Sequence, residues 1–176
     1  MSLHADAGDV LRAFEHPDPA QGVLRDEYLA FLGAHPDAMS RTCRIGHLTA
    51  SALVMDASGA RVLLTLHPRV GRWLQLGGHC EPSDRTLQAA ARREVVEECG
   101  IEPLSLSAAP IRLDRHRVRC GAATSEHLDV QYLAVVPDDA VPVISEESDD
   151  LRWHPVDGLP AGIDTSVIQL VRDASR

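Results

Sequence analysis

The sequence predicts a mixed α/β domain preceded by a helical extension, and three observations support this fold class. Residues 6–35 repeat apolar side chains at helical spacing, whereas β-like runs dominate from His47 onward. A helical stretch from about Asp84 to Cys99 interrupts these runs, and a second helical segment closes the chain. Helices and strands that alternate in this way are typical of a sheet covered by helices.

The N-terminal segment is predicted to form two helices. They read DAGDVLRAFEH and VLRDEYLAFLGAH and are separated by the breaker PDPAQG. In the second helix, Leu24, Tyr28 and Leu32, together with Phe31, form a stripe at i, i+4 and i+8 that is sufficient to dock one helix on a core. We therefore assign residues 1–40 to a helical extension and residues 41–176 to the main domain.

Strands are predicted on both sides of the central helix. Before it, HLTASALVMD and RVLLTLH flank a hairpin turn at ASG, and the short strand RWLQL ends at Gly77-Gly78. After it, strand character resumes in LSLSAAPIRLDRH and in HLDVQYLAVV, where two sets of residues alternate as a sheet requires. An acidic loop, a last strand LRWHPV and a closing helix follow, with Asp164 or Thr165 as the helix N-cap.

Composition and charge exclude several classes of protein. The chain has 176 residues, which suits one domain, and its formal charge of −9 argues against a partner such as a long nucleic acid. It contains no apolar stretch long enough for a membrane span and no signal peptide, so we expect a cytoplasmic location. The four cysteines are scattered without a CxxC pair, a spacing that fits neither a zinc ribbon nor a disulfide framework.

The central helix carries three carboxylates within five residues. At about 100° per residue, Glu94, Glu97 and Glu98 share one side of the helix. Like charges at this spacing repel each other, so the arrangement is unfavourable unless something positive lies there. Clustered carboxylates without histidine or cysteine suit Mg²⁺ or Mn²⁺ rather than zinc. The alternative is a solvated acidic face that Arg92 and Arg93 offset.

The segment around these carboxylates, GGHCEPSDRTLQAAARREVVEECGI, resembles the Nudix box of the MutT-like Nudix hydrolases. Gly78 opens the box, and its second half matches one residue for one: Arg93, Glu94, Val95, Glu97, Glu98, Gly100 and Ile101. Asp84 stands where the family has Glu, and eight residues rather than seven separate it from Arg93. We place the extra residue in the loop before the helix, with Ser83 or Asp84 available as N-cap. This departure puts in question the family's contact between that acid and the box arginine.

The resemblance implies a fold, a reaction and a cofactor. The fold is an α/β/α sandwich around a mixed β-sheet. The reaction is hydrolysis of a phosphoanhydride bond in a nucleoside diphosphate linked to another moiety, and it depends on Mg²⁺ or Mn²⁺. Arg93 orients Glu94. The implied metal ligands are the Gly77 carbonyl, Glu94, Glu97, Glu98 and Glu147, the last because it lies six residues before Trp153.

Several other residues are candidates for the substrate, a small nucleoside diphosphate derivative. Arg69 and Arg72 could meet its phosphates and Trp73 could stack on its base, while Gly78 and His79 lie beside the box. Solvated loop arginines and a core tryptophan are the alternatives. A second set of potential metal ligands comprises His79, Cys80, His116, Cys120, His127 and Asp129. Its spacing fits no recognised zinc motif, which favours side chains at a strand face or the rim of the pocket.

Two other functions stay open at this point. One is a Nudix domain that senses a nucleotide without cleaving it, although all three box glutamates are present here. The other is an enzyme similar to isopentenyl diphosphate isomerase, which shares the fold and uses histidine and cysteine in its site. The N-terminal helices could pair subunits in a homodimer or cap the pocket.

Overall fold

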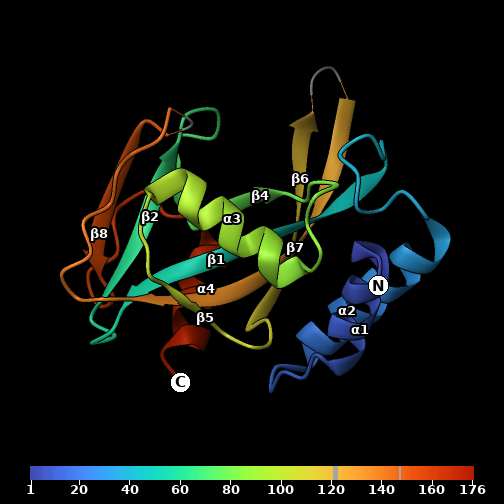
Figure 1. Cartoon of the computed structure of the whole chain (residues 1–176), viewed down its shortest axis with the longest axis horizontal. Coiled ribbons are helices and arrows are strands. Elements are labelled where there is room, and N and C mark those ends of the chain that lie inside the picture. Colours follow the sequence, from blue (N-terminus) through green and yellow to red (C-terminus); the bar gives the residue numbers. More distant parts are fainter. Residues whose placement is uncertain (121–122, 147) are drawn as a thin grey trace.

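A curled, mixed β-sheet with helices on both faces forms the body of the protein, and two N-terminal helices pack at one side (Figure 1). The structure is a computed structural model that describes residues 1–120, 123–146 and 148–176. In chain order the elements are α1 (Leu3–Ala13), α2 (Pro19–Ala34), β1 (Gly46–Asp56), β2 (Arg61–His67), β3 (Arg72–Leu74), β4 (Leu76–His79), α3 (Leu87–Cys99), β5 (Ser105–Leu106), β6 (Arg112–Cys120), β7 (Ala123–Val136), β8 (Asp150–Pro155) and α4 (Thr165–Ala174).

Strand β1 is the centre of the sheet. It runs parallel to β7 along its whole length, from Gly46 opposite Glu126 to Asp56 opposite Val136. Its other edge is shared, because β4 pairs with the first half of β1 and β2 pairs with the second half. In the same way β5 and β6 share the far edge of β7. The sheet therefore divides at both edges, and the cleft of the candidate site is lined by residues of β2, β4 and β6 from both divided edges.

Alternate residues of β1 enter two different cores. Leu48, Ala50, Ala52 and Val54 join the larger apolar cluster, which includes the inner face of α3. The residue between the last two, Leu53, belongs to the smaller cluster with the inner face of α4. This period of two is the geometry of a strand buried on both faces. The sandwich of helix, mixed sheet and helix is thereby confirmed.

The N-terminal helices share the larger core with the sheet. Ala7, Leu11, Tyr28 and Leu32 are buried members of that cluster. Gln21 of α2 also pairs with the backbone of Leu113 in β6, donating to the carbonyl at 3.0 Å and accepting from the N–H at 2.7 Å. The boundary at residue 40 stays a prediction, but the two helices are firmly attached to the sheet.

Two predicted local details are wrong. Gly77 and Gly78 lie inside strand β4 rather than after a strand, because β3 and β4 are separate strands that flank Gln75. Helix α3 begins at Leu87 with Thr86 as its N-cap, and the Thr86 hydroxyl accepts from the Ala89 N–H at 3.0 Å. Neither Ser83 nor Asp84 caps it.

The remaining signals at helix ends are confirmed. Gly100 ends α3 in the left-handed conformation, with φ of 65°. Asp164 caps α4 by accepting from the Ser166 N–H at 3.0 Å. In the part of the chain that the structure describes, no helix combines the length and the apolar character needed to cross a membrane.

Candidate active site

Two glycines let strand β4 fit between β1 and α3. A Cβ atom on Gly77 would lie 2.3 Å from the Ser51 Cβ, which leaves no room for a side chain. Gly77 also has φ of 150°, a backbone conformation that residues with a side chain rarely adopt. A Cβ on Gly78 would lie 2.7 Å from a carboxylate oxygen of Glu94. The glycines therefore bring the backbone of β4 against the acidic face of α3.

Arg93 joins the loop, the strand and the helix at this point. Its guanidinium donates to both carboxylate oxygens of Asp84, at 3.2 and 2.9 Å, and to the backbone carbonyl of His79 at 2.9 Å. It also donates to Glu94 and to Glu97, each at 2.9 Å. The contact between the box acid and the box arginine is thus present. The extra residue lies in the loop before α3, as expected, and does not rotate the helix.

The Asp84–Arg93 pair is held in its ionised form. Hydrogen bonding to Asp84 is the main cause that raises the pKa of Arg93 above its usual value. Burial by itself would raise the pKa of Asp84, but the hydrogen bonds from Arg93 and from the Glu81 N–H, together with the charge of Arg93, outweigh burial and lower that pKa. Because only a fifth of the Arg93 side chain is exposed, water screens the pair weakly.

The three box carboxylates line one cleft. Glu94 is 12% exposed and Glu97 is 56% exposed, while Glu98 is half-buried. The single guanidinium of Arg93 is shared by the carboxylates of Asp84, Glu94 and Glu97, so this group of contacting residues carries a net negative charge. Hard oxygen donors in excess over nearby cations fit Mg²⁺ or Mn²⁺. Glu147 lies outside the described residues, and its role and that of the Gly77 carbonyl stay predictions.

The predicted substrate residues divide between the cleft and the core. Arg69 and Arg72 are exposed and line the cleft, and Arg72 is paired with Asp164 at 2.7 Å. Trp73 packs edge-on against His154, with ring centroids 4.8 Å apart, and against the smaller apolar cluster. Trp73 is not among the described residues that line the cleft.

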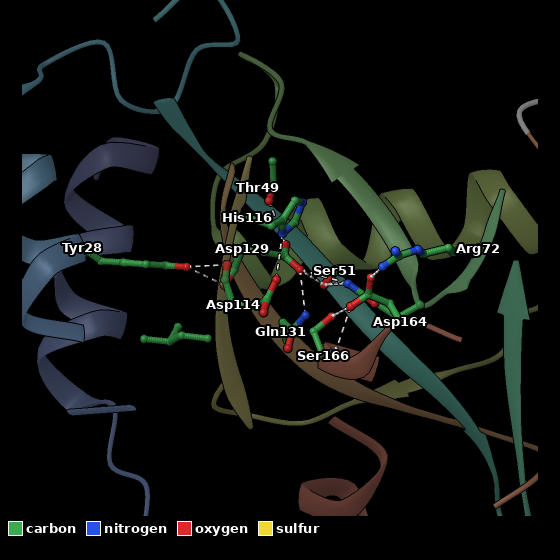
Figure 2. A network of polar contacts seen from close by, with 12 residues as sticks. Tyr28, Thr49, Ser51, Arg72, Asp114, His116, Asp129, Gln131, Asp164 and Ser166 are labelled. Carbon is green, nitrogen blue, oxygen red and sulfur yellow. Dashed lines mark hydrogen bonds and ion pairs between the residues drawn. The ribbon is translucent and has the colours of Figure 1, made fainter. Parts of the chain in front are cut away.

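A polar face of the sheet also lines the cleft, and the sequence had suggested its central residue, Asp129, only as a potential metal ligand. Its centre is the buried carboxylate of Asp129 on β7 (Figure 2). Four side chains donate to that carboxylate, two from β1, one from β7 itself and one from the residue between β3 and β4: Thr49 at 2.8 Å, Ser51 at 2.6 Å, Gln131 at 3.0 Å and Gln75 at 3.2 Å. The sequence signal for this face was the alternation of polar residues in HLDVQY and in HLTAS, which places those residues on one face of each strand.

A group of histidines continues this polar face. The rings of His47, His79 and His127 lie 4.8 to 5.1 Å apart, centroid to centroid. Burial, followed by the neighbouring histidines, lowers the pKa of His127 to about 3. Burial is also the main cause that lowers the pKa of His47 and of His79. All three rings are therefore neutral at physiological pH.

A fourth histidine has a different environment. His116 lies 5.4 Å from His127 by ring centroids, and its Nδ1 is paired with Asp114 at 2.8 Å. Burial alone would lower the pKa of His116, but the hydrogen bond to Asp114 and the nearby carboxylates raise it.

The predicted histidine and cysteine set is thus only partly assembled. His79, His116 and His127 come together, and His47 joins them from β1. Cys80 lies at the edge of the larger apolar core beside the cleft, where burial raises the pKa of its thiol to about 12, and Asp129 is held by the hydroxyl and amide donors of the polar face. The side chain of Cys120 lies outside the described residues.

Comparisons with known proteins identify the family. The NUDIX domain model matches residues 46–173. A search of curated proteins gives no match.

Solved structures share the fold. A NUDIX-family hydrolase from Clostridium perfringens is 23% identical, with a TM-score of 0.61, over 72% of this chain and 95% of that one. The Escherichia coli dihydroneopterin triphosphate pyrophosphohydrolase is 19% identical, with a TM-score of 0.58, over 71% of this chain and 92% of that one. A Caenorhabditis elegans Ap4A hydrolase is 21% identical, with a TM-score of 0.56, over 73% of this chain and 94% of that one. The match of the family model over residues 46–173, together with the box and the fold, shows that this chain belongs to the Nudix family.

Proposed function

We propose that the protein hydrolyses a phosphoanhydride bond in a nucleoside-diphosphate-linked small molecule and that the reaction depends on Mg²⁺ or Mn²⁺. The observation that carries this proposal is the arrangement around Arg93, which holds Glu94 and Glu97 beside β4 and leaves the acidic face of α3 open to the cleft. Structural relatives named as hydrolases of Ap4A and of dihydroneopterin triphosphate support the class of bond.

Each residue has a separate task in this proposal. Glu94, Glu97 and Glu98 would hold the divalent cation, which supplies neutralisation of the phosphate charge and lowers the pKa of an attacking water. Arg93 does not contact the substrate but fixes the orientation of Glu94. Arg69 and Arg72, which also line the cleft, would supply positive charge for the remaining phosphate oxygens.

Neutralising one carboxylate tests the proposal. Glu98→Gln keeps the shape of the side chain on a half-buried position of α3 but removes its charge. We expect kcat to fall by on the order of 100-fold or more while the far-UV circular dichroism is unchanged. The assay incubates protein, Mg²⁺ and a panel of nucleoside diphosphate derivatives, and it measures release of orthophosphate or mononucleotide.

Glu102→Gln is the matched control. Glu102 lies just beyond α3, is exposed and pairs with Arg92 outside the cleft, so its loss should leave kcat unchanged. Full turnover in Glu98→Gln would refute the proposal. Nucleotide binding without any turnover in the wild type would instead identify a sensing domain, and isomerisation of a prenyl diphosphate would identify the isomerase alternative.

A further inference from the structure

Three histidines on one face of the sheet come from three adjacent strands. His47 on β1 lies directly opposite His127 on β7 in the parallel register. His79 on β4 lies opposite Thr49, two residues along β1 from His47, and therefore on the same face. Because hydrogen-bonded strands fix all three backbone positions, the rings are brought together by rigid elements rather than by a loop.

The ring nitrogens converge closely enough to share one ion. One nitrogen from each of the three rings lies within 4.8 Å of the others. A tetrahedral zinc ion with bonds of about 2.1 Å needs nitrogens about 3.4 Å apart, so each ring would move inward by less than about 1 Å. Rotation about the side-chain bonds provides movement of that size without any shift of the strands.

Each of the three rings has at least one buried nitrogen without a hydrogen bond in the described part of the protein. Nε2 of His79 and Nε2 of His127 are buried and make no hydrogen bond there. Both ring nitrogens of His47 are also buried without a hydrogen bond. The nearby Cys43 backbone raises the pKa of His47, but burial outweighs it and lowers that pKa. Buried polar atoms are nearly always satisfied, so this concentration of unsatisfied nitrogens indicates a missing partner.

We propose that His47, His79 and His127 bind a zinc ion. Neutral imidazole is a preferred ligand of zinc, whereas Mg²⁺ takes oxygen ligands, so this site differs in chemistry from the carboxylates of α3. His79 and His127 line the same cleft as those carboxylates, while His47 lies buried behind them. Three protein ligands with one side facing a cleft leave an open coordination position for water or a ligand atom.

Two neighbouring groups fit the ion less well. His116 is already paired with Asp114 and its ring lies beyond His127. A second set of converging ligand atoms, from His35, Asp37 and Cys43, lies in the connector between α2 and β1. Asp37 is exposed there, and that connector contains no strand to fix the set.

Zinc binding can be measured directly on the full chain. Tag-free protein is stripped with a chelator and titrated with Zn²⁺ by calorimetry at about pH 7.5, and with Co²⁺ as a visible-light probe of the coordination geometry. We expect one tight equivalent of zinc, an absorption spectrum typical of four- or five-coordinate Co²⁺, and a higher melting temperature with zinc.

Variants then assign the ligands. His79→Gln and His127→Gln should each weaken zinc binding by on the order of 100-fold or more, because each removes a direct ligand. His116→Gln and Cys43→Ser should keep the wild-type affinity, and so should Glu98→Gln, which separates this site from the carboxylates of α3. Circular dichroism and melting without metal show whether each variant is folded.

The proposal has clear contrary outcomes. It is overturned if folded wild-type protein binds no zinc, or if His79→Gln and His127→Gln both bind as tightly as the wild type. It is also overturned if Cys43→Ser abolishes binding that the histidine variants retain. The titration uses no substrate, so its failure would leave the proposed hydrolysis unaffected.

Discussion

Arg93 shows how one side chain can define the geometry of a site. Its planar guanidinium contacts Asp84 through two hydrogen bonds and at the same time reaches Glu94 and Glu97. A lysine in its place has one compact charge and no fork of donors, so it cannot reproduce these directions. The loop before α3, the strand β4 and the acidic face of α3 are therefore all positioned by the arginine specifically.

Arg93→Lys should reduce catalysis more than it reduces stability. We expect kcat to fall by on the order of 100-fold, because the orientation of Glu94 is lost, while the melting temperature changes by only a few degrees. Hydrolysis kinetics and thermal melting measure the two effects. The control is Arg92→Lys, since Arg92 contacts Glu102 and the Leu104 carbonyl away from the cleft. An unchanged kcat in Arg93→Lys would mean that the charge alone matters.

Gly77 is a position where the backbone itself is under constraint. A methyl group there would meet Ser51 at 2.3 Å in a conformation that side chains rarely adopt. We expect Gly77→Ala to lower the free energy of unfolding by ~3–5 kcal/mol. Urea unfolding measures this loss. Gly22→Ala is the control, because Gly22 lies within α2 with nothing near its Cβ position, and that variant should gain about 0.5–1 kcal/mol.

At the scale of elements, the β1–β2 hairpin depends on one carboxylate. Asp56 accepts from the backbone N–H groups of Ala60 and Arg61, at 2.9 and 3.1 Å, and from the Arg61 side chain at 2.7 Å. Burial alone would raise the pKa of Asp56, but these hydrogen bonds lower it below its usual value. The ionised carboxylate therefore stabilises the folded hairpin.

The sign of the pH dependence follows from that lowered pKa. The contribution of Asp56 is fully present above the unfolded pKa of about 3.9 and is lost as the pH falls through the lower, folded value. Asp56→Asn should cost about 1–2 kcal/mol at neutral pH, and its difference from the wild type should shrink below about pH 3.9. Urea unfolding between pH 7 and pH 3 measures both. Asp9→Asn, an exposed position on α1, should show little effect, and a pH-independent cost of Asp56→Asn would contradict the assignment.

The order of the elements could be predicted because it depends on local signals. Gly100 stops α3, Asp164 starts α4, and the alternation in HLDVQYLAVV marks a strand. The start of α3 could not be predicted, because Asp84 is taken up by Arg93 and by the Glu81 N–H, which leaves Thr86 to cap the helix. Such competition for one side chain is a tertiary effect that a local pattern does not contain.

The candidate site was predictable to a similar extent. The carboxylates of α3 follow from helical periodicity, since one helix carries them all. The Asp129 network and the histidine group require the register of β1, β4 and β7, which places His47 opposite His127. Parallel pairing between residues eighty positions apart leaves no local mark in the sequence. His47 was therefore missed, and Trp73 was considered for the cleft although it packs with the core.

At the scale of the whole molecule, the N-terminal helices contribute to the site from a distance. Asp6 of α1 accepts a hydrogen bond from the Leu87 N–H at 2.8 Å, which satisfies a free donor at the start of α3. A negative charge at a helix N-terminus is favourable, so α1 stabilises the helix that carries the box glutamates. Tyr28 of α2 donates to the Asp114 carbonyl at 2.6 Å, beside the polar wall of the cleft (Figure 2).

These contacts predict that the extension and the sheet unfold together. Leu32 on α2 is 4% exposed within the larger core, so Leu32→Ala should lower the free energy of unfolding by ~2–4 kcal/mol. The two tryptophans, Trp73 and Trp153, lie on β3 and β8, two strands that pair with β2, and β2 and β8 are at the end of the sheet remote from α2 (Figure 1). Their fluorescence therefore reports the unfolding of the sheet and not of the helix that carries the substitution.

In urea, we expect tryptophan fluorescence and far-UV circular dichroism to give one coincident transition in the wild type and one equally shifted transition in Leu32→Ala. The control is Val23→Ala on the same helix, where the side chain is 61% exposed and its removal should change the midpoint little. A fluorescence midpoint that Leu32→Ala leaves unmoved, with an earlier loss of helical signal, would show that residues 1–40 unfold separately. Coincident and equally shifted transitions would instead mean that the core beneath α3 depends on a segment outside the matched residues 46–173. The spacing of the box carboxylates would then depend on that segment too.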